Sequence, residues 1–334
     1  MKLGVRAAPL NADLRIRTYA GPADHAPIVA VETAAHLADG LDYVPTVEQL
    51  VAEIEHPSGF DPVRHILVGE VAGRIVAVGR VAHVRRDDED TFEISANVQP
   101  EARRRGVGRA VLKRLEGLAR EMAAEMAGEL PPGRRRWYAS WCVDSADGTR
   151  VLLAAEGYRP VRYFFEMLRE GLADVPDLPL PDGLDMRPVR PADHRRIYDA
   201  QAEAFRDHWG AREWTDAMFE GLFASPDLDT SLWRVAWDGD EVAGGCANWV
   251  FPEENERLGV SRGWLEQVSV RRPWRRRGLA RALMAASMRA FAERGLTSAA
   301  LGVDAENPTG ALGLYEGLGF HVHKPTTSYR KAMP

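Results

Sequence analysis

Residues 268–280 have the sequence Val268-Ser269-Val270-Arg271-Arg272-Pro273-Trp274-Arg275-Arg276-Arg277-Gly278-Leu279-Ala280. Val268 and Val270 alternate with a polar residue as in a β-strand, and Pro273 cannot continue a sheet ladder. Gly278 lets backbone approach a ligand closely. A helix that begins here directs free N–H groups and the positive end of its dipole toward the turn, and the arginines add full charges. The stretch therefore predicts a strand, a basic turn and a helix start that together bind a pyrophosphate.

The pattern Arg275-x-x-Gly278-x-Ala280 after a strand resembles the signature turn of the GCN5-related N-acetyltransferase (GNAT) superfamily. A basic turn without any ligand could carry the same pattern, so support is needed elsewhere in the chain. The resemblance implies that the turn and the strand before it bind acetyl-CoA. The residues that it assigns to the cofactor are Val268, Ser269, Val270, Arg275, Arg276, Arg277, Gly278, Leu279, Ala280 and Arg281.

The composition is that of an ordinary globular protein. The chain has 334 residues, which at roughly 150 residues per domain predicts two domains. A net charge of −6 argues against a general nucleic-acid binder. Cys142 and Cys246 form no disulfide framework, and no His/Cys/Asp spacing indicates a metal site, so we expect no metal. The first residues lack the apolar run of a signal peptide, and no stretch approaches membrane-spanning length, so we expect a cytoplasmic protein.

An internal repeat divides the chain. The triplets Ala23-Asp24-His25 and Ala192-Asp193-His194 lie 169 positions apart, and Arg103 repeats Arg275 at a distance of 172. This period is too long for a solenoid and indicates a duplicated domain. We expect a lead-in at 1–13, a first domain at 14–170, an extended proline-rich linker at 171–183 and a second domain at 184–334.

The first domain repeats the strand and the basic turn. If this turn also binds the cofactor, the residues involved are Ala96, Asn97, Val98, Arg103, Arg104, Arg105, Gly106, Val107 and Gly108.

A second segment, 301–320, resembles the other cofactor-binding segment of the family. In the family an Asn contacts the pantetheine arm and a Tyr on the following helix faces the sulfur. The resemblance therefore assigns Asn307 to the cofactor and Tyr315 to the general acid that protonates the leaving thiolate. An isolated Tyr on an amphipathic helix would more simply be a core aromatic, but the whole neighbourhood matches. In the first domain Leu153 aligns with Tyr315, and a leucine cannot donate a proton. We therefore expect a degenerate first domain that at most binds acetyl-CoA.

Acetyl transfer to an amine also needs an oxyanion donor and a base. Backbone N–H groups of 268–270 can polarise the thioester carbonyl, as the resemblance implies. Glu266 lies four residues before Val270 and is expected on the same strand face, which makes it the candidate base. Many family members place a glutamate two residues earlier, where this chain has Trp264, and a structural strand carboxylate remains the alternative for Glu266.

The acceptor side is less clearly marked. Asp207, His208 and Trp209 fall in the first helical region of the second domain, where the family usually frames its acceptor, and a surface loop is the alternative. Glu254 lies in an acidic run, 253–256, that could attract a cationic amine or simply be solvated.

These observations predict an α/β (α+β) protein of two tandem GNAT-like domains, each a mixed, mostly antiparallel sheet flanked by helices. The predicted function is acetyl-CoA-dependent N-acetyltransfer to a primary amine of a small molecule or peptide, catalysed by the second domain. The tandem layout is similar to that of the mycothiol synthases, which would imply a cysteinyl pseudodisaccharide acceptor. The alternative is a non-catalytic acyl-CoA-binding sensor or scaffold. We expect no nucleic-acid or membrane partner, and either a monomer with pseudo-dimeric domains or a homodimer.

Overall fold

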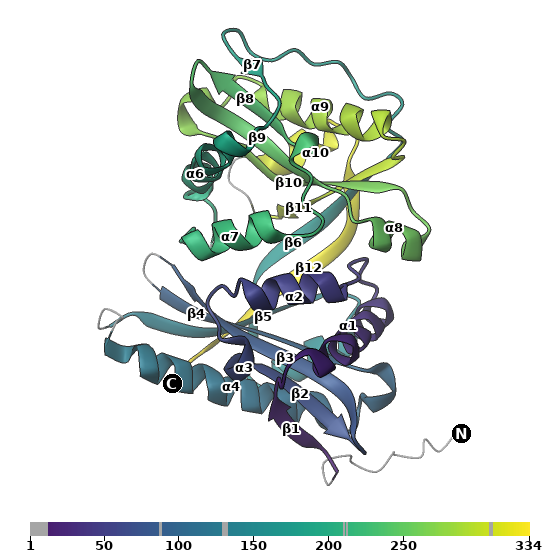
Figure 1. Cartoon of the computed structure of the whole chain (residues 1–334), viewed down its shortest axis with the longest axis vertical. Coiled ribbons are helices and arrows are strands. Elements are labelled where there is room, and N and C mark those ends of the chain that lie inside the picture. Colours follow the sequence, from purple (N-terminus) through teal and green to yellow (C-terminus); the bar gives the residue numbers. More distant parts are fainter. Residues whose placement is uncertain (1–12, 87–88, 129–132, 210, 212, 307–309) are drawn as a thin grey trace. The chain divides into compact units, whose positions relative to one another are not determined.

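The computed structural model describes residues 13–86, 89–128, 133–209, 211, 213–306 and 310–334. It divides into two compact units (Figure 1). Unit 1 comprises Met1–Val161 and Thr327–Pro334, and unit 2 comprises Arg162–Thr326. No helix within the described ranges combines the length and the apolar character needed to cross a bilayer.

Unit 1 contains a sheet in the order β1-β2-β3-β4-β5. All neighbours are antiparallel except β4 and β5, which are parallel. The end of β12, from Thr327, also belongs to this unit. The elements of unit 1 are β1 (Arg15–Thr18), α1 (His25–Asp39), α2 (Val47–Glu55), α3 (Pro62–His65), β2 (Ile66–Val71), β3 (Arg74–Arg85), β4 (Glu89–Val98), α4 (Val107–Glu125), β5 (Arg135–Val143), α5 (Asp147–Ala155) and the start of β6 (Arg159–Glu170).

Unit 2 repeats this plan with the strand order β6-β11-β10-β9-β8-β7. Here β10 and β11 are the parallel pair, and β6 with β11, β10 with β9, β9 with β8 and β8 with β7 are antiparallel. Besides most of β6, its elements are β7 (Asp185–Met186), α6 (His194–Phe205), α7 (Asp216–Ala224), β8 (Arg234–Asp238), β9 (Glu241–Trp249), α8 (Pro252–Leu258), β10 (Arg262–Val270), α9 (Leu279–Glu293), β11 (Ser298–Asp304), α10 (Ala311–Glu316) and the start of β12 (His321–Ala332).

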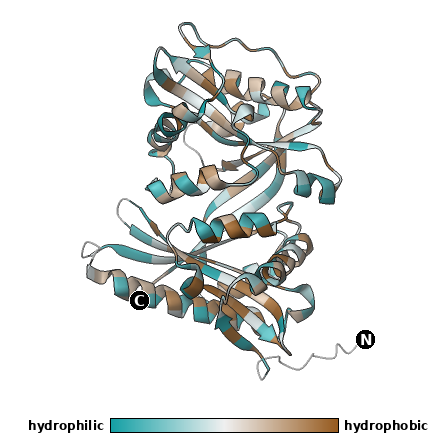
Figure 2. Cartoon of the chain, in the orientation of Figure 1, coloured by the Kyte–Doolittle hydropathy of each residue, from teal (hydrophilic) through white to brown (hydrophobic). Residues whose placement is uncertain are grey.

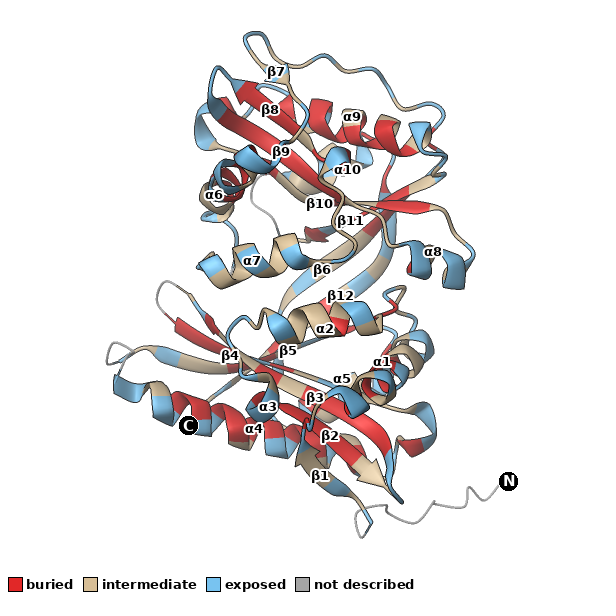
Figure 3. Ribbon diagram, in the orientation of Figure 1, coloured by how far each residue is buried: buried red, intermediate tan, exposed pale blue. Residues whose placement is uncertain are grey.

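Each sheet is covered by helices on both faces (Figure 1). In unit 1, α4 packs on one face and α1 with α2 on the other. In unit 2, α9 and α10 pack on one face and α6 with α7 on the other. Apolar residues gather on the central strands (Figure 2), and α9 and β9 are largely buried whereas α7 contains no buried residue (Figure 3). This is the mixed, helix-flanked architecture expected from the sequence.

The compact units do not divide at the expected linker. Residues 164–170 of β6 pair with β11, so the division falls between Val161 and Arg162. The proline-rich stretch 171–183 lies wholly within unit 2, where Leu172 is buried in the core and Leu178 and Leu180 pack against it. The guanidinium of Arg289 on α9 donates to the Pro176 carbonyl. Because its leucines fill a core, this stretch is part of the domain and not a spacer.

Candidate active site

Two parallel strands of unit 2 separate halfway along their length. β10 pairs with β11 only from Arg262↔Ser298 to Trp264↔Ala300. Beyond that point β11 follows β6 as far as Asp304, and β10 follows β9 as far as Val270. The facing edges of residues 265–270 and 301–304 are therefore not paired with each other. Such an opening between two strands can admit an extended ligand.

A β-bulge lies in β10 beside this opening. Glu266 pairs with Ala247 and Ser269 with Gly245, so the register skips Gln267 and Val268, and Gln267 has a φ of 35°. A bulge leaves residues out of the ladder and redirects their backbone groups.

The bulge corrects the expectation that Glu266 shares a strand face with Val270. Paired residues of antiparallel strands point to the same face. Since Ala247 and Gly245 are two residues apart, Glu266 lies on the face of Ser269. Ala247 belongs to the same core cluster as Ile197 of α6, so this is the α6 face of the sheet.

The basic turns of the two units share one backbone conformation. Arg276 has a φ of 60° and Gly278 a φ of 84°, and Arg104 and Gly106 have 62° and 88°. Gly278 is the N-cap of α9, and Gly106 is the N-cap of α4. Left-handed residues before a helix start turn successive N–H groups to one side and form an anion-binding concavity. A Cβ at Gly278 would meet no atom within 4 Å, so the glycine serves the φ value and leaves the concavity open.

The signature arginine holds this turn in place. Arg275 donates from Nε to the Val270 carbonyl (2.9 Å), from Nη1 to Asp207 (2.7 Å) and from Nη2 to the Ala204 carbonyl (3.1 Å). It thereby connects the end of β10 to the end of α6.

Unit 1 has the same anchor: Arg103 donates to the Val98 carbonyl (3.0 Å), to Asp39 (2.6 Å) and to the Ala35 carbonyl (3.2 Å). Both guanidinium groups are committed to protein atoms, which differs from the phosphate contact expected from the sequence.

Asp207 belongs to the same anchor. Its carboxylate accepts hydrogen bonds from Arg272 and Arg275, and these two interactions hold its pKa well below the usual range. The other arginines of the turn are more accessible. Arg276 is exposed, Arg277 donates to the Asp182 carbonyl (2.9 Å) and Arg281 to the Gly317 carbonyl (3.3 Å).

Tyr315 lies on α10, half-buried against the core on the α9 face of the sheet. Burial, with a smaller contribution from Cys246, raises its pKa to about 12, so the phenol keeps its proton at neutral pH. Leu153 takes the corresponding place in unit 1, because the amide of Tyr158 donates to the Leu153 carbonyl as the amide of Phe320 donates to that of Tyr315. Leu153 is fully packed in its core.

Glu266 is accessible to solvent, yet burial by the surrounding protein raises its pKa above the usual value of a carboxyl group. Surrounding protein atoms can displace part of a carboxylate's hydration while the side chain keeps a solvent-exposed surface.

Trp264, at the position where the family often carries a glutamate, donates from its indole to the buried carboxylate of Glu254 (3.1 Å). Glu254 is therefore engaged inside unit 2 and is not part of a solvated acidic surface.

The remaining acceptor candidates lie after α6. His208 is exposed and contacts Phe205, and burial lowers its pKa. Trp209 packs against Phe164 of β6 and lies under the guanidinium of Arg162.

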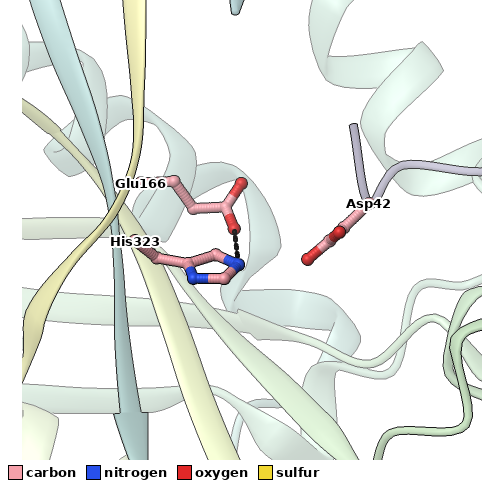
Figure 4. A group of neighbouring side chains, drawn as sticks. All are labelled: Asp42, Glu166 and His323. Carbon is pink, nitrogen blue, oxygen red and sulfur yellow. Dashed lines mark ion pairs between the residues drawn. The ribbon is translucent and has the colours of Figure 1, made fainter. Parts of the chain in front are cut away.

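Further along β6, Glu166 and His323 of β12 form an ion pair of 4.0 Å (Figure 4); Asp42, drawn with them, belongs to unit 1. Asn307 lies outside the described residues.

Unit 1 contains a cavity of about 850 Å³. As in unit 2, its parallel strands pair only in their first part, from Glu89↔Arg135 to Glu93↔Ala139. Unlike β10, β4 keeps an unbroken register with its antiparallel neighbour. The predicted residues that line the cavity are Ala96, Asn97, Val98, Arg103, Arg104, Gly106 and Gly108. Of the other two, Val107 is buried in the core and Arg105 is half-buried.

The model of the acetyltransferase (GNAT) family matches residues 36–138 and 194–320. The chain belongs to the GNAT acetyltransferase family.

Among its relatives, a mycothiol acetyltransferase of Geodermatophilus obscurus is 31% identical over 98% of this chain and 99% of its own length. The enzyme of the same name from Salinispora tropica is 30% identical over 88% of this chain and 89% of its own.

Solved GNAT structures share the fold. A GCN5-related N-acetyltransferase from Sphaerobacter thermophilus has a TM-score of 0.72 at 26% identity, covering 98% of this chain and 97% of that one. A tandem GNAT protein from the clavulanic acid biosynthesis pathway has a TM-score of 0.68 at 16% identity, covering 96% and 99%. The predicted tandem GNAT fold is confirmed.

Family membership and the named relatives establish the reaction class. The protein is an N-acetyltransferase that moves an acetyl group to an amine, and the non-catalytic sensor alternative is not favoured. The GNAT family indicates an acyl-CoA donor, and the relatives indicate a small-molecule amine as acceptor. The sequence reasoning missed the bulge at Gln267 and the use of the signature arginines as anchors, since neither has a local pattern of its own.

Proposed function

We propose that the protein acetylates the free amine of a cysteinyl pseudodisaccharide, the deacetylated form of mycothiol, with acetyl-CoA as donor, and that unit 2 performs the chemistry. Support comes from relatives named mycothiol acetyltransferase that match nearly the full length of the chain. The single observation that carries the assignment to unit 2 is that Tyr315 lies where unit 1 has Leu153.

The residues of unit 2 fit acetyl-CoA. The concavity of Arg276 and Gly278 at the start of α9 suits a pyrophosphate, and the exposed Arg276 adds charge. The opening between β10 and β11 suits an extended pantetheine arm, whose amides can bond to backbone groups of the strand edges where these strands no longer pair with each other. Bound acetyl-CoA supplies the activated acetyl group as a thioester.

The bulge supplies the polarising groups. Backbone N–H groups of Gln267 and Val268 stand outside the β9 ladder, and they can donate to the thioester oxygen as negative charge develops on it. β4 of unit 1 keeps an unbroken register and so lacks this feature.

The acid and the base approach from opposite faces of the sheet. Glu266, on the α6 face, takes a proton from the incoming ammonium, and its raised pKa brings it closer to that task than an ordinary carboxylate. Tyr315, on the α9 face, donates to the departing sulfur. Since the phenol has a pKa of about 12 and a thiol one of about 8.5, Tyr315 acts mainly as a hydrogen-bond donor to the thiolate rather than giving up its proton completely.

We extend the proposal to unit 1 as an acyl-CoA-binding partner without chemistry of its own. Its basic turn has the same conformation and opens onto the cavity, but the position of the acid is Leu153.

The experiment is acetylation of deacetylated mycothiol by the purified protein, followed by release of free CoA and by mass spectrometry of the product. Glucosamine, spermidine and a lysine peptide serve as comparison acceptors. The proposal requires deacetylated mycothiol to have the highest kcat/KM and to gain one acetyl group on nitrogen. Preference for another amine would overturn the acceptor, and product formation from none of them would overturn the proposed function.

A further inference from the structure

The duplicated helices α1 and α6 bury corresponding positions. With the 169-residue offset of their Asp-His starts, Ile28, Val31, Glu32 and Ala35 correspond to Ile197, Ala200, Gln201 and Ala204, and all eight are buried. Each helix packs on the two corresponding strands of its own sheet. Gln201 of unit 2 therefore takes the place of Glu32 of unit 1.

The strands correspond equally well. The amide of Gln99 donates to the Val76 carbonyl, and the amide of Arg271 donates to that of Ala243. The register with the preceding strand skips Val76 in one unit and Ala243 in the other.

Val76 and Ala243 are therefore equivalent, and four residues further along each strand Arg80 of β3 corresponds to Ala247 of β9. Arg80 pairs with Ser95, and Ala247 pairs with Glu266. The candidate base of unit 2 therefore stands where unit 1 has Ser95.

In unit 1 this place holds a cation that the chain itself supplies. The guanidinium of Arg80 forms ion pairs with Glu32 of α1 and Glu53 of α2, and all three side chains line the cavity. One guanidinium and two carboxylates leave a net charge of −1.

In unit 2, Ala247 takes the place of Arg80, and Gln201 takes the place of Glu32, the partner of Arg80 on α1. Gln201 is 2% exposed, and neither its amide oxygen nor its amide nitrogen has a hydrogen-bond partner among the described residues. A buried amide without partners is costly, and native proteins keep few of them. The neighbouring position contributes the carboxylate of Glu266.

We propose that Gln201 and Glu266 form the subsite for the cationic amine of the acceptor, in the place that the Arg80 guanidinium occupies in unit 1. This inference rests on the proposed function. The side-chain oxygen of Gln201 accepts a hydrogen bond from the ammonium, and the Glu266 carboxylate accepts a second bond and then the proton. The neutral amine that remains attacks the thioester carbonyl through its lone pair and forms the C–N bond. The C–S bond breaks with its electron pair on sulfur, CoA leaves as the thiolate hydrogen-bonded by Tyr315, and the amine's second proton leaves to solvent.

The charges explain why one unit turns over and the other does not. In unit 2, the amide of Gln201 and the single carboxylate of Glu266 can bind one ammonium, and the carboxylate can then accept a proton from that ammonium. In unit 1 the guanidinium is held by two carboxylates, and its raised pKa keeps it protonated at neutral pH, so it gives no neutral nucleophile. Arg80 thus fills the subsite of unit 1 permanently.

The first test is Gln201→Leu, which keeps the side chain's approximate size and removes its oxygen. The KM for deacetylated mycothiol should rise about 10- to 100-fold, because a hydrogen bond to a charged group is lost, while the Kd of acetyl-CoA stays unchanged. Tyr198→Phe is the matched control, since Tyr198 is buried on the same helix and donates to the Thr215 carbonyl (2.9 Å). It should lower the Tm without changing the KM for the acceptor.

The second test rebuilds the unit 1 arrangement in unit 2 by the double substitution Gln201→Glu and Ala247→Arg. Because the new arginine has a carboxylate partner on α6, the variant should keep its Tm and its acetyl-CoA affinity and lose acetylation of deacetylated mycothiol.

Retained acetylation by the double variant, or equal changes in acceptor KM and acetyl-CoA Kd in Gln201→Leu, would overturn the subsite. Failure of the proposed function is distinguishable, because the wild-type protein itself would then acetylate no amine.

Discussion

The Arg275 side chain joins three segments of unit 2, and this predicts the effect of Arg275→Lys. A lysine keeps the positive charge but replaces a planar fork with a single point donor. Of the hydrogen bonds to Val270, Asp207 and Ala204, it can keep one. Two are lost, each worth about 1 kcal/mol for a half-exposed side chain. We therefore expect the free energy of unfolding of unit 2 to fall by about 2 kcal/mol.

The assay is thermal unfolding of the protein without ligand, followed by calorimetric titration with acetyl-CoA. For a unit of this size, a loss of about 2 kcal/mol lowers the Tm by roughly 4–8 °C. Arg276→Lys is the control: Arg276 is exposed, and a lysine has the same left-handed strain there, so its Tm without ligand should not move. Arg103→Lys should repeat the destabilisation in unit 1.

An Arg275→Lys variant that unfolds like the wild type without ligand and loses acetyl-CoA affinity would refute the anchor role of Arg275. That result would make Arg275 a direct phosphate ligand whose protein contacts carry no stability.

Two further predictions concern Glu266 and the basic turns. In the profile of kcat/KM against pH, titration of Glu266 should give an acidic limb above the ordinary pKa of a carboxyl group, and Glu266→Gln should remove that limb. The limb that comes from the ammonium of the acceptor should remain. The fold raises the pKa of Glu266, so folding favours the protonated form and loses stability as pH rises through the folded pKa. The substitution should therefore raise the Tm at pH 8 and not at pH 4, and a lower Tm at pH 8 would contradict the desolvated carboxylate. Gly278→Glu should eliminate one equivalent of bound acetyl-CoA together with turnover, and Gly106→Glu should eliminate the other equivalent with turnover intact; a single equivalent in the wild type would exclude unit 1 as a binder.

Local patterns in the sequence were sufficient for the fold and for the position of the basic turns. The alternation of Val268 and Val270, the glycine at the helix start and the repeat of the Asp-His starts each depend on residues close in the chain. Cys142 and Cys246 are buried free thiols, as small apolar side chains would be. These are features that backbone sterics and hydrophobic periodicity determine.

The failures involve residues distant in sequence. The bulge at Gln267 depends on the register with β9, which no pattern within β10 reveals, and it moved Glu266 to the other face. Arg275 and Asp207 lie 68 positions apart and were assigned to cofactor and acceptor, whereas they bond to each other. The proline-rich stretch was expected to be a spacer because prolines exclude regular structure, but its leucines are buried in unit 2. The sequence repeat aligns Glu32 with Gln201, but only the ion pair between Glu32 and Arg80 in the structure indicates what the two positions do.

The central claim, that unit 2 performs the transfer with Tyr315 at the departing sulfur, is tested most directly by Tyr315→Phe. The measurement is kcat for deacetylated mycothiol together with the Kd of acetyl-CoA for the same preparation. The kcat of the variant should be lower by about 10²- to 10⁴-fold, with a Kd within about twofold of the wild type, since the phenol acts when charge develops on sulfur. A phenylalanine variant with wild-type kcat would contradict the claim, because the chemistry would then not depend on the one group that distinguishes unit 2 from the leucine of unit 1.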